Sequence, residues 1–450
     1  MRLGHYLQIG FFLLFVYAGT GFMWTPEGSK SVSEKENRGL SQLPQWSGSS
    51  IWSGQYWRGI ENYVADHVPY RDALVGISKK IASWQGMSGT ENTVILASKA
   101  DNMAQVMKSA SSEEVASSQA TTSLNEASAS IPSAGNISPV ESHPEPSARK
   151  SEQTSHLAGK VLIIDDRAVN LFSYVSTAGK LYADTINRLR DHVADQLGSD
   201  VSVSVLIAPT GAEFLQSETL KKLSSSQQEA IVDVYRKLKP GIKTVDALAL
   251  MQNHIDEDLY FRTDHHWTAT GAYYGYAAYM KATGLSPVAL KTYAKEEVPG
   301  FLGSLYSATL HKKLEKRPDT IVVYKPFVKH DYTVHYAGPL KMDLLDMNHA
   351  HRMNKYRIFL SGDRPWGQIT TEVNNGKRLA VIKDSYGNAL IPFLLPHFSE
   401  IYVIDPRQFN KPLIPFLQQH NILELLFVNN SEVLTDTHFM QLVGAMGDAG

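Results

Sequence analysis

The sequence contains no cysteine among its 450 residues. This absence excludes disulfide bonds, zinc sites built on thiolates and a cysteine nucleophile, and it says little about the redox compartment. The chain also lacks an excess of charge, because its formal net charge is -2 with 20% of residues charged. We therefore do not expect nucleic acid among its partners. The 43% hydrophobic content is ordinary for a globular protein of this length.

Aromatic residues are missing from a long internal stretch. Residues 85–171 contain no Phe, Tyr or Trp, and residues 109–156 are mostly Ser, Ala, Glu, Thr and Pro. Such a composition offers too little apolar surface to offset the entropy lost on ordering. We predict a disordered Ser/Ala-rich insert at 109–156, between an N-terminal helical segment at 34–95 and a main domain at 158–450. A glycosylated stalk is the alternative.

A long hydrophobic run begins close to the N-terminus. Arg2 and His5 come before the run YLQIGFFLLFVYAGTGFMW, which has about the 20 residues needed to cross a bilayer. The run reaches Trp24 without a clear cleavage pattern, which favours an uncleaved membrane anchor over residues 1–25. The small residues at 18–20 leave a cleaved signal peptide as the alternative. Either segment predicts that the rest of the chain is exported, as an anchored extracytoplasmic domain or as a secreted one.

Short β-branched runs alternate with amphipathic stretches from residue 160 onward. The runs are KVLIID, VSVSVLIAP, TIVVYK, RLAVIKDS, EIYVIDP and ILELLFVNN, and the stretches include AGKLYADTINRLRDHVADQL and SSQQEAIVDVYRKL. This alternation predicts an α/β fold with a largely parallel sheet covered by helices on both faces. Ligands of such sheets collect at the carboxyl ends of strands. Upstream, helices are predicted over residues 54–63 and 72–84.

The strand run RLAVIKDS ends in a candidate nucleophile. The buried run ends at Lys383, Asp384 and Ser385 form a turn, and a helix is predicted from Gly387. A serine between a strand and a helix has an exposed hydroxyl, and backbone N–H groups around it can stabilise an oxyanion. The sequence does not match the G-x-S-x-G elbow of the usual hydrolases. Capping of the helix by Asp384 or Ser385 is the structural alternative.

The stretch YFRTDHHWTATGAYY supplies an acid and a base. Thr268 is predicted to cap the helix that follows, which places the residues before it in the entering loop. Asp264 and His266 are two residues apart and can lie on the same side of an extended segment. The carboxylate can then orient the imidazole, and a neutral imidazole can take a serine proton near pH 7. His265 is predicted to point elsewhere, and Trp267 to pack in the core.

A metal site is the rival interpretation of this stretch. The run Asp264-His265-His266 resembles the signature of metal-dependent Asp-His-His phosphoesterases, and Asp165-Asp166 after VLII can add ligands. Adjacent histidines rarely ligate one ion, however, and further ligands are not evident. We therefore expect neither a metal nor another cofactor.

Two smaller features are candidates for substrate binding. In VIDPRQF, Arg407 follows a strand, where its guanidinium can bind an acyl carbonyl or a polysaccharide oxygen. A surface salt bridge explains Arg407 equally well. In VPGFLGSLYSA, Gly303 and Ser304 lie in a loop that can bring a backbone N–H close to a substrate, and loop structure alone explains them equally well.

The joint pattern of TDHHWT, VIKDSYGNALIPFL and YVIDPR resembles the DHHW protein family. It is similar to the SGNH-hydrolase-like domains of alginate O-acetylation proteins, over about residues 34–95 and 158–445. The resemblance implies an SGNH-like catalytic domain with Asp264 as orienting acid, His266 as general base and Ser385 as nucleophile. Arg407 matches the arginine after the next strand. The alginate proteins usually have a smaller polar residue in place of His265 and a Gly-Thr type of turn before the serine.

The resemblance also implies a function. It implies an extracytoplasmic O-acyltransferase, acetyl by default, in which Ser385 passes an acyl group to a hydroxyl of a cell-surface or secreted polysaccharide. A membrane-bound partner would supply the acyl group. An acetylesterase of the same fold is the nearest alternative, and a non-catalytic polysaccharide-binding or assembly protein is the alternative from another class. Side chains of Ser385 and His266 far apart in space would favour the last.

Overall fold

The structure is a computed structural model that describes residues 32–33, 38–39, 43–44, 46, 55–66, 155–158, 161–198, 200–336 and 338–448. The predicted anchor, the predicted helix at 72–84 and all but the last two residues of the predicted insert lie outside the described residues. In the described part of the chain, no helix combines the length and the apolar composition needed to cross a membrane.

An eight-stranded sheet forms the centre of the fold, in the order β11-β10-β12-β14-β13-β15-β6-β7. The parallel strands are β14 (Glu400–Ile404), β13 (Arg378–Lys383), β15 (Glu424–Asn430), β6 (Ser202–Ala208) and β7 (Lys243–Thr244). The antiparallel strands at the other edge are β12 (Trp366–Thr371), β10 (His330–His335) and β11 (Pro339–Met342). The fold is therefore mixed α/β, and the predicted parallel arrangement holds for one half of the sheet.

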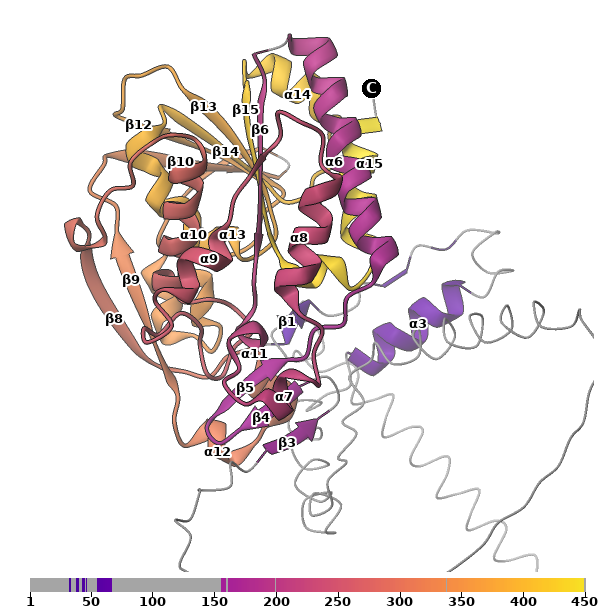
Figure 1. Ribbon diagram of the computed structural model, residues 1–450, viewed down its shortest axis with the longest axis vertical. Coiled ribbons are helices and arrows are strands. Elements are labelled where there is room, and N and C mark those ends of the chain that lie inside the picture. Colours follow the sequence, from indigo (N-terminus) through magenta and orange to yellow (C-terminus); the bar gives the residue numbers. More distant parts are fainter. Residues whose placement is uncertain are drawn as a thin grey trace, which may run out of the picture.

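One face of the sheet is covered by four helices (Figure 1). They are α6 (Ser176–Leu197), α8 (Gln227–Lys237), α14 (Leu413–Gln419) and α15 (His438–Asp448). Alternate residues of the central strands, such as Val205, Ile382 and Phe427, point into this core. The helices α6 and α8 correspond to the two amphipathic stretches predicted from the sequence.

The opposite face packs against α9 (Ala247–Gln252), α10 (Ala269–Ala282) and α13 (Gly387–Leu390). The intervening strand residues, such as Leu206, Val381 and Val428, point into this second core. The central strands are apolar along their whole length because successive side chains enter the two cores alternately.

The helix α10 begins where the sequence predicts. The hydroxyl of Thr268 accepts the N–H of Gly271 at 3.2 Å, which caps the first turn. Gly271 also allows close packing, because a Cβ there would lie 2.3 Å from the carbonyl oxygen of Leu259. The loop before α10 is thus held against the body of the protein at its exit.

Two predicted strands belong to other sheets, and their assignment to the parallel sheet was wrong. The KVLIID run forms β4 (Val161–Ile164), between β3 (Ser155–Ala158) and β5 (Arg167–Asn170) in an antiparallel sheet. The TIVVYK run forms β9 (Asp319–Lys325), which pairs antiparallel with β8 (Ala294–Phe301). Parallel pairing needs a crossover of a dozen or more residues. Only a two-residue turn separates β4 from β5, so these strands pair as a hairpin.

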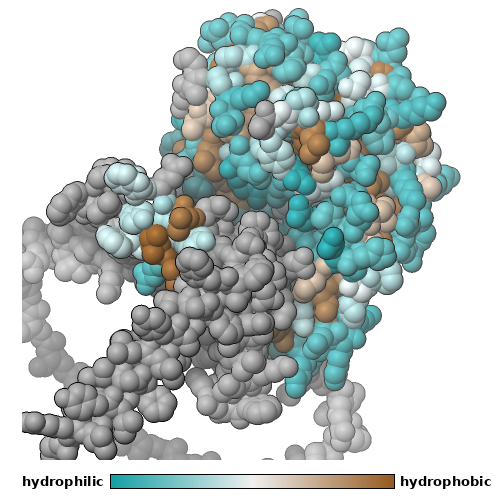
Figure 2. All heavy atoms as spheres, turned by 180° about the vertical axis from the view of Figure 1, so that it is seen from behind, coloured by the Kyte–Doolittle hydropathy of each residue, from teal (hydrophilic) through white to brown (hydrophobic). Residues whose placement is uncertain are grey.

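The remaining described elements are short, apart from α3 (Gln55–Asp66), which confirms the helix predicted at 54–63. They are β1 (Val32–Ser33), β2 (Arg38–Gly39), α7 (Glu218–Lys221), α11 (Ser304–Thr309), α12 (Lys312–Glu315) and the 3-10 turns η2 (Gly211–Phe214), η3 (Leu290–Thr292), η4 (Met347–His351), η5 (Lys355–Ile358), η6 (Ile391–His397) and η7 (Ser431–Leu434). On the face seen in Figure 2, hydrophobic residues of the main domain are scattered among hydrophilic ones.

Candidate active site

Polar residues follow three neighbouring parallel strands at one edge of the sheet. Asp384 and Ser385 come after β13, Asp405 comes after β14, and Asn430 ends β15. The N–H of Asp384 still bonds to the carbonyl of Val428 on β15, so the turn that holds Ser385 starts directly from the sheet. This is the edge where the α/β arrangement places ligands.

His266 connects the two motifs that the sequence singled out. Its Nε2 lies 2.7 Å from Ser385 Oγ, and its Nδ1 lies 2.5 Å from Asp264 Oδ1. Asp264 and His266 are buried, whereas Ser385 is partly exposed. A carboxylate, an imidazole and a reachable hydroxyl therefore form a continuous hydrogen-bonded row.

The loop that holds Asp264 and His266 is joined to the serine turn by aromatic side chains. Trp267 Nε1 donates to the carbonyl of Tyr386 at 3.0 Å, and the Tyr386 hydroxyl donates to the carbonyl of His265 at 2.5 Å. The ring of Tyr356 stacks on His266 at 3.7 Å with an 11° tilt, and its hydroxyl donates to the Ser385 carbonyl at 3.1 Å. These contacts keep the imidazole and the serine at a constant separation.

Backbone amides hold the carboxylate of Asp264: Ser304 N donates to Oδ2 at 2.7 Å, and His266 N donates to Oδ1 at 3.0 Å. Gly303 N donates to the hydroxyl of the neighbouring Thr263 at 3.1 Å. A Cβ on Gly303 would lie 2.2 Å from the Cβ of Asp264, so only glycine permits this approach. The amides of Gly303 and Ser304 are thus engaged inside the protein, and the hydrogen bonds do not favour their predicted contact with a substrate.

Burial acts on both members of the acid–base pair. Burial raises the pKa of Asp264, but the neighbouring imidazoles of His266 and His265 and the bond from Ser304 N outweigh it and hold that pKa well below its ordinary value. Burial also lowers the pKa of His266, helped by His265 and opposed by Asp264. We therefore describe the pair at neutral pH as an ionised Asp264 beside a neutral His266, which is the state required of a general base.

Asp384 fixes the turn before the serine. Its Oδ1 accepts the N–H of Tyr386 at 2.9 Å, and its Oδ2 accepts Asn430 N at 2.8 Å and Asn430 Nδ2 at 3.1 Å. Complete burial raises the pKa of Asp384 to about 6, against the opposing effect of these hydrogen bonds. Asp384 therefore fixes the serine turn but does not cap α13, which has no side-chain cap, and the hydroxyl of Ser385 stays available to His266.

Arg407 belongs to an ion-pair cluster beside the site. Its Nη2 lies 2.6 Å from Asp405 Oδ2 and 2.9 Å from Asp363 Oδ2. The buried ammonium of Lys383 lies 2.7 Å from Asp363 Oδ1 and 3.4 Å from Asp405 Oδ2, and Asn388 Nδ2 also donates to Asp363 Oδ1. The salt-bridge interpretation of Arg407 thus holds, and substrate binding by its exposed part stays a prediction.

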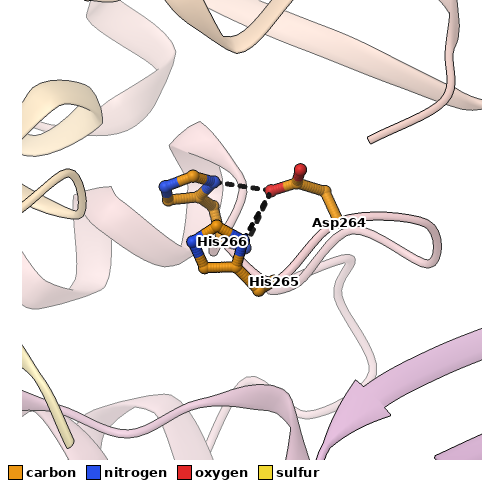
Figure 3. Close-up of side chains that lie close together, drawn as sticks. All are labelled: Asp264, His265 and His266. Atoms are coloured by element: carbon orange, nitrogen blue, oxygen red, sulfur yellow. Dashed lines mark hydrogen bonds and ion pairs between the residues drawn. The ribbon is translucent and has the colours of Figure 1, made fainter. Parts of the chain in front are cut away.

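Asp264, His265 and His266 lie close enough for their ligand atoms to fall within 4.8 Å of one another (Figure 3). Among the described residues, Asp165 and Asp166 are not part of this group; they lie in the β4–β5 turn, where Asp166 pairs with Arg317. The oxygens of Asp264 are already bonded to His266 and to Ser304 N. The arrangement therefore favours an acid–base pair over a metal centre.

The structure corrects the prediction that His265 points away. Its ring lies 3.8 Å from the ring of His266, and its Nδ1 lies 2.6 Å from the hydroxyl of Ser304. An extended segment would separate neighbouring side chains, but this loop is not an extended strand; it is bent.

Sequence reasoning missed two residues that contact the row, Tyr356 and Tyr386, and two residues of the ion-pair cluster beside it, Asp363 and Lys383. A lysine at the end of a Val-Ile strand is itself a signal, because a buried ammonium requires carboxylate partners. The tyrosines gave no comparable signal, since their contacts depend on the tertiary fold.

The family model of the DHHW protein matches residues 36–404 of this chain. The chain belongs to the DHHW protein family. A crystal structure of a DHHW family protein from Eubacterium siraeum is 27% identical to this DHHW protein, with a TM-score of 0.58, over 65% of this chain and 97% of that chain. No curated protein matches this chain significantly.

Two further solved structures match part of this chain. Bacillus cereus PatB1, solved with a sulfonyl adduct, is 21% identical with a TM-score of 0.52, over 63% of this chain and 97% of that one. This likeness shows a common fold. The O-acetyltransferase domain of Pseudomonas putida AlgJ is 14% identical with a TM-score of 0.35, over 65% of this chain and 99% of that one. A likeness at that level does not bear on function.

Proposed function

We propose that this DHHW protein is an extracytoplasmic serine-dependent O-acyltransferase with an SGNH-like catalytic domain. Its acyl group is acetyl, and its acceptor is a cell-surface or secreted polysaccharide. The observation that carries the proposal is the row Asp264–His266–Ser385, with separations of 2.5 Å and 2.7 Å. These are the separations that general-base activation of a serine requires.

In the first half-reaction Ser385 is the nucleophile. His266 Nε2 takes the proton of Ser385 Oγ as this oxygen attacks the acyl carbonyl, and a tetrahedral oxyanion forms. Asp264 holds the imidazole by Nδ1 and stabilises the imidazolium. The oxyanion then collapses, the bond to the leaving group breaks, and His266 returns the proton to the leaving group. The acyl group remains as an ester on Ser385.

The second half-reaction reverses these roles. A sugar hydroxyl gives its proton to His266 Nε2 and attacks the ester carbonyl, and Ser385 leaves with that proton. Among the described residues, the Ser385 amide has no acceptor within the protein, which leaves it free to donate to the oxyanion. Removing one such donor typically costs about 100-fold or more in rate.

The remaining parts of the proposal rest on the sequence and on relatives. The hydrophobic run at residues 1–25 supports a membrane anchor with the catalytic domain outside the cytoplasm. A membrane-bound partner would deliver the acyl group. The sulfonyl adduct of PatB1 agrees with a nucleophile in this fold, since sulfonyl reagents modify nucleophiles. A non-catalytic role is disfavoured by the contact of Ser385 with His266.

The test uses the full chain and an activated acetyl ester. The protein is quenched in acid, digested and examined by mass spectrometry, and we expect one acetyl group on the peptide that contains Ser385. Ser385→Ala should remove the adduct and lower turnover by about 10⁴-fold or more. Its stability should change by only about 1 kcal/mol, the worth of one hydrogen bond.

Ser226→Ala is the matched control. Ser226 also precedes a helix and accepts the N–H of Glu229 at 3.1 Å, but it caps α8 rather than joining the site. This variant should keep full activity. An unchanged adduct or turnover in Ser385→Ala contradicts the assignment of the nucleophile. Adding an oligosaccharide acceptor distinguishes an acyltransferase from an esterase, because a transferase moves acetyl to the sugar whereas an esterase releases only acetate.

A further inference from the structure

The first histidine of the DHHW motif, His265, packs on the second, His266. The ring centroids of His265 and His266 lie 3.8 Å apart with a 37° tilt, and both rings lie on the same side of the Asp264 carboxylate (Figure 3). His265 Nδ1 is 3.9 Å from Asp264 Oδ1, which is too far for a hydrogen bond. His265 therefore touches the acid–base pair without replacing either member of it.

A single serine holds His265 and the acid at once. Ser304 Oγ lies 2.6 Å from His265 Nδ1 and accepts the backbone N–H of His265 at 3.4 Å. The amide of the same serine donates to Asp264 Oδ2 at 2.7 Å. Because its oxygen already accepts one N–H, the hydroxyl of Ser304 is free to donate its own hydrogen to Nδ1.

We propose that His265, held by Ser304, is a positioning residue that fixes the ring of His266 and the carboxylate of Asp264 in line with Ser385. His266 is clamped between two rings, since Tyr356 stacks on it at 3.7 Å and His265 at 3.8 Å. Rotation of the imidazole about χ2 would collide with one ring or the other. The inference rests on the proposed function for its consequence in catalysis, but the clamp itself is a property of the fold.

The clamp also affects the proton affinity of His266. The titratable groups that face His266 are Asp264 and His265 from its own loop, Tyr356 from η5, Tyr386 from the serine turn and Asp363 from the loop after η5. Burial lowers the pKa of His266 most, and His265 lowers it further, while the two carboxylates raise it. A change of His265 should therefore raise the pKa of His266, because it removes a group that lowers this pKa and admits water.

Four variants separate the parts of the clamp. His265→Asn keeps an amide group where Nδ1 meets Ser304 but removes the ring. His265→Ala removes the hydrogen bond as well. Ser304→Ala releases the ring of His265 but keeps the amide that binds Asp264, and Ser304→Thr restores the hydroxyl.

The decisive measurement does not use activity. In the full chain labelled with ¹⁵N-histidine, NMR reports the pKa of His266 and the far-downfield proton between His266 Nδ1 and Asp264. We expect His265→Asn and His265→Ala to raise this pKa and to weaken the downfield signal. Ser304→Ala should do so to a smaller extent, and Ser304→Thr should restore the original values. His254→Ala is the control, because His254 stacks on Tyr274 at 3.9 Å away from the site.

Turnover of an acetyl ester supplies the second readout. We expect kcat/KM of His265→Ala to fall by about 10- to 100-fold, mostly in kcat, because the base is misaligned rather than removed. The acid limb of its pH profile should move to higher pH. An unchanged pKa and downfield signal in His265→Asn overturn the clamp. An inactive wild-type chain whose His266 pKa still responds to His265→Asn overturns the proposed function alone and supports the clamp.

Discussion

At the scale of single residues, two buried groups on either side of the candidate nucleophile have pKa values displaced toward each other. Burial raises the pKa of Asp384 to about 6 and lowers that of His266 from its ordinary value. Asp384 receives only neutral N–H groups, whereas Asp264 faces two imidazoles and keeps a low pKa. The pKa values of these two aspartates are therefore displaced in opposite directions within one site.

The raised pKa of Asp384 predicts a pH-dependent stability. A carboxyl group whose folded pKa exceeds its unfolded value binds its proton more tightly in the folded state, so its contribution grows more favourable as pH falls from above 6 toward 3.8. Relative to Asp384→Asn, which has no titration there, the wild type should gain about 1 kcal/mol of unfolding free energy between pH 8 and pH 5. Urea unfolding of both proteins at the two pH values measures this.

If the unfolding free energies of wild type and Asp384→Asn differ by the same amount at pH 8 and pH 5, the raised pKa of Asp384 is contradicted. The comparison is made as a difference because other buried carboxyl groups change in the opposite sense. The pKa of Asp363, for example, is depressed, since the charges of Lys383 and Arg407 outweigh its burial. The contribution of Asp363 to the unfolding free energy falls as the pH is lowered, and it does so in both proteins.

The sequence brought out the three residues of the hydrogen-bonded row but not their surroundings. Ser385, His266 and Asp264 were found because a strand–serine–helix context and an Asp-x-His spacing each restrict geometry locally. Tyr356 and Asp363 were not found, since only the folded η5 loop brings them to His266. His265 was placed wrongly because the alternation of an extended strand was applied to a bent loop.

At the scale of elements, the site is made by three loops that leave different parts of the fold. The loop before α10 gives the acid and base, the turn after β13 gives the serine, and the turn before α11 supports the acid. The last of these depends on one glycine. Gly303 lies against Asp264 so closely that any side chain must displace the carboxylate.

We predict that Gly303→Ala lowers activity by about 100-fold, the cost of displacing a catalytic group by roughly 1 Å. The added Cβ would meet Asp264 Oδ2 at 2.3 Å and would break its bond to Ser304 N. Turnover of an acetyl ester measures the loss, and circular dichroism checks that the fold persists.

Gly284→Ala is a matched control for Gly303→Ala. An alanine Cβ at Gly284 would meet nothing within 4 Å, although φ there is +76°, so the variant adds backbone strain without touching the site. It should lose some stability and keep its activity. Full activity in Gly303→Ala would show that Asp264 tolerates displacement, and the orienting role of Asp264 would then be wrong.

Elements were predictable where the pattern was long and periodic. The helices α6, α8 and α10 and the strands β6, β13, β14 and β15 were all expected from their sequences. The pairing partners of β4 and β9 were not predicted, because an apolar run indicates a strand but not the strand beside it. Whether a strand pairs parallel or antiparallel with the next depends on the length of the connection between them. For β4, the short connection to the following strand already indicated a hairpin.

At the scale of the whole molecule, this chain is longer than the solved DHHW family protein from Eubacterium siraeum. The Eubacterium siraeum protein matches 65% of this chain but 97% of its own length. About a third of the present sequence therefore has no counterpart in that structure. The hydrophobic N-terminal run and the Ser/Ala-rich stretch at 109–156 are the parts whose composition differs most from a folded domain.

The last prediction concerns that stretch. Residues 109–156 lack aromatic groups and have few large aliphatic ones, so they can bury little surface on ordering. The strand β3 starts at Ser155, so a deletion that spares it removes residues 109–154 and joins the ends by a short Gly/Ser linker. The connection between α3 and β3 shortens by about half, which changes the closure free energy by only about 0.6 kcal/mol. The deleted protein should stay folded and keep full activity on a small acetyl ester.

Hydrogen exchange of the full chain tests the premise separately from the deletion. Amides across 109–154 should exchange at the rate of an unstructured peptide, and a variant with the same residues in scrambled order should behave identically. Slow exchange would reveal an ordered element and would refute the division of the chain. Activity on a polymeric acceptor is the informative contrast, because a segment that positions the enzyme within an envelope affects large acceptors alone. Loss on polymer with retention on the small ester would assign the stretch a spacing role outside the catalytic domain.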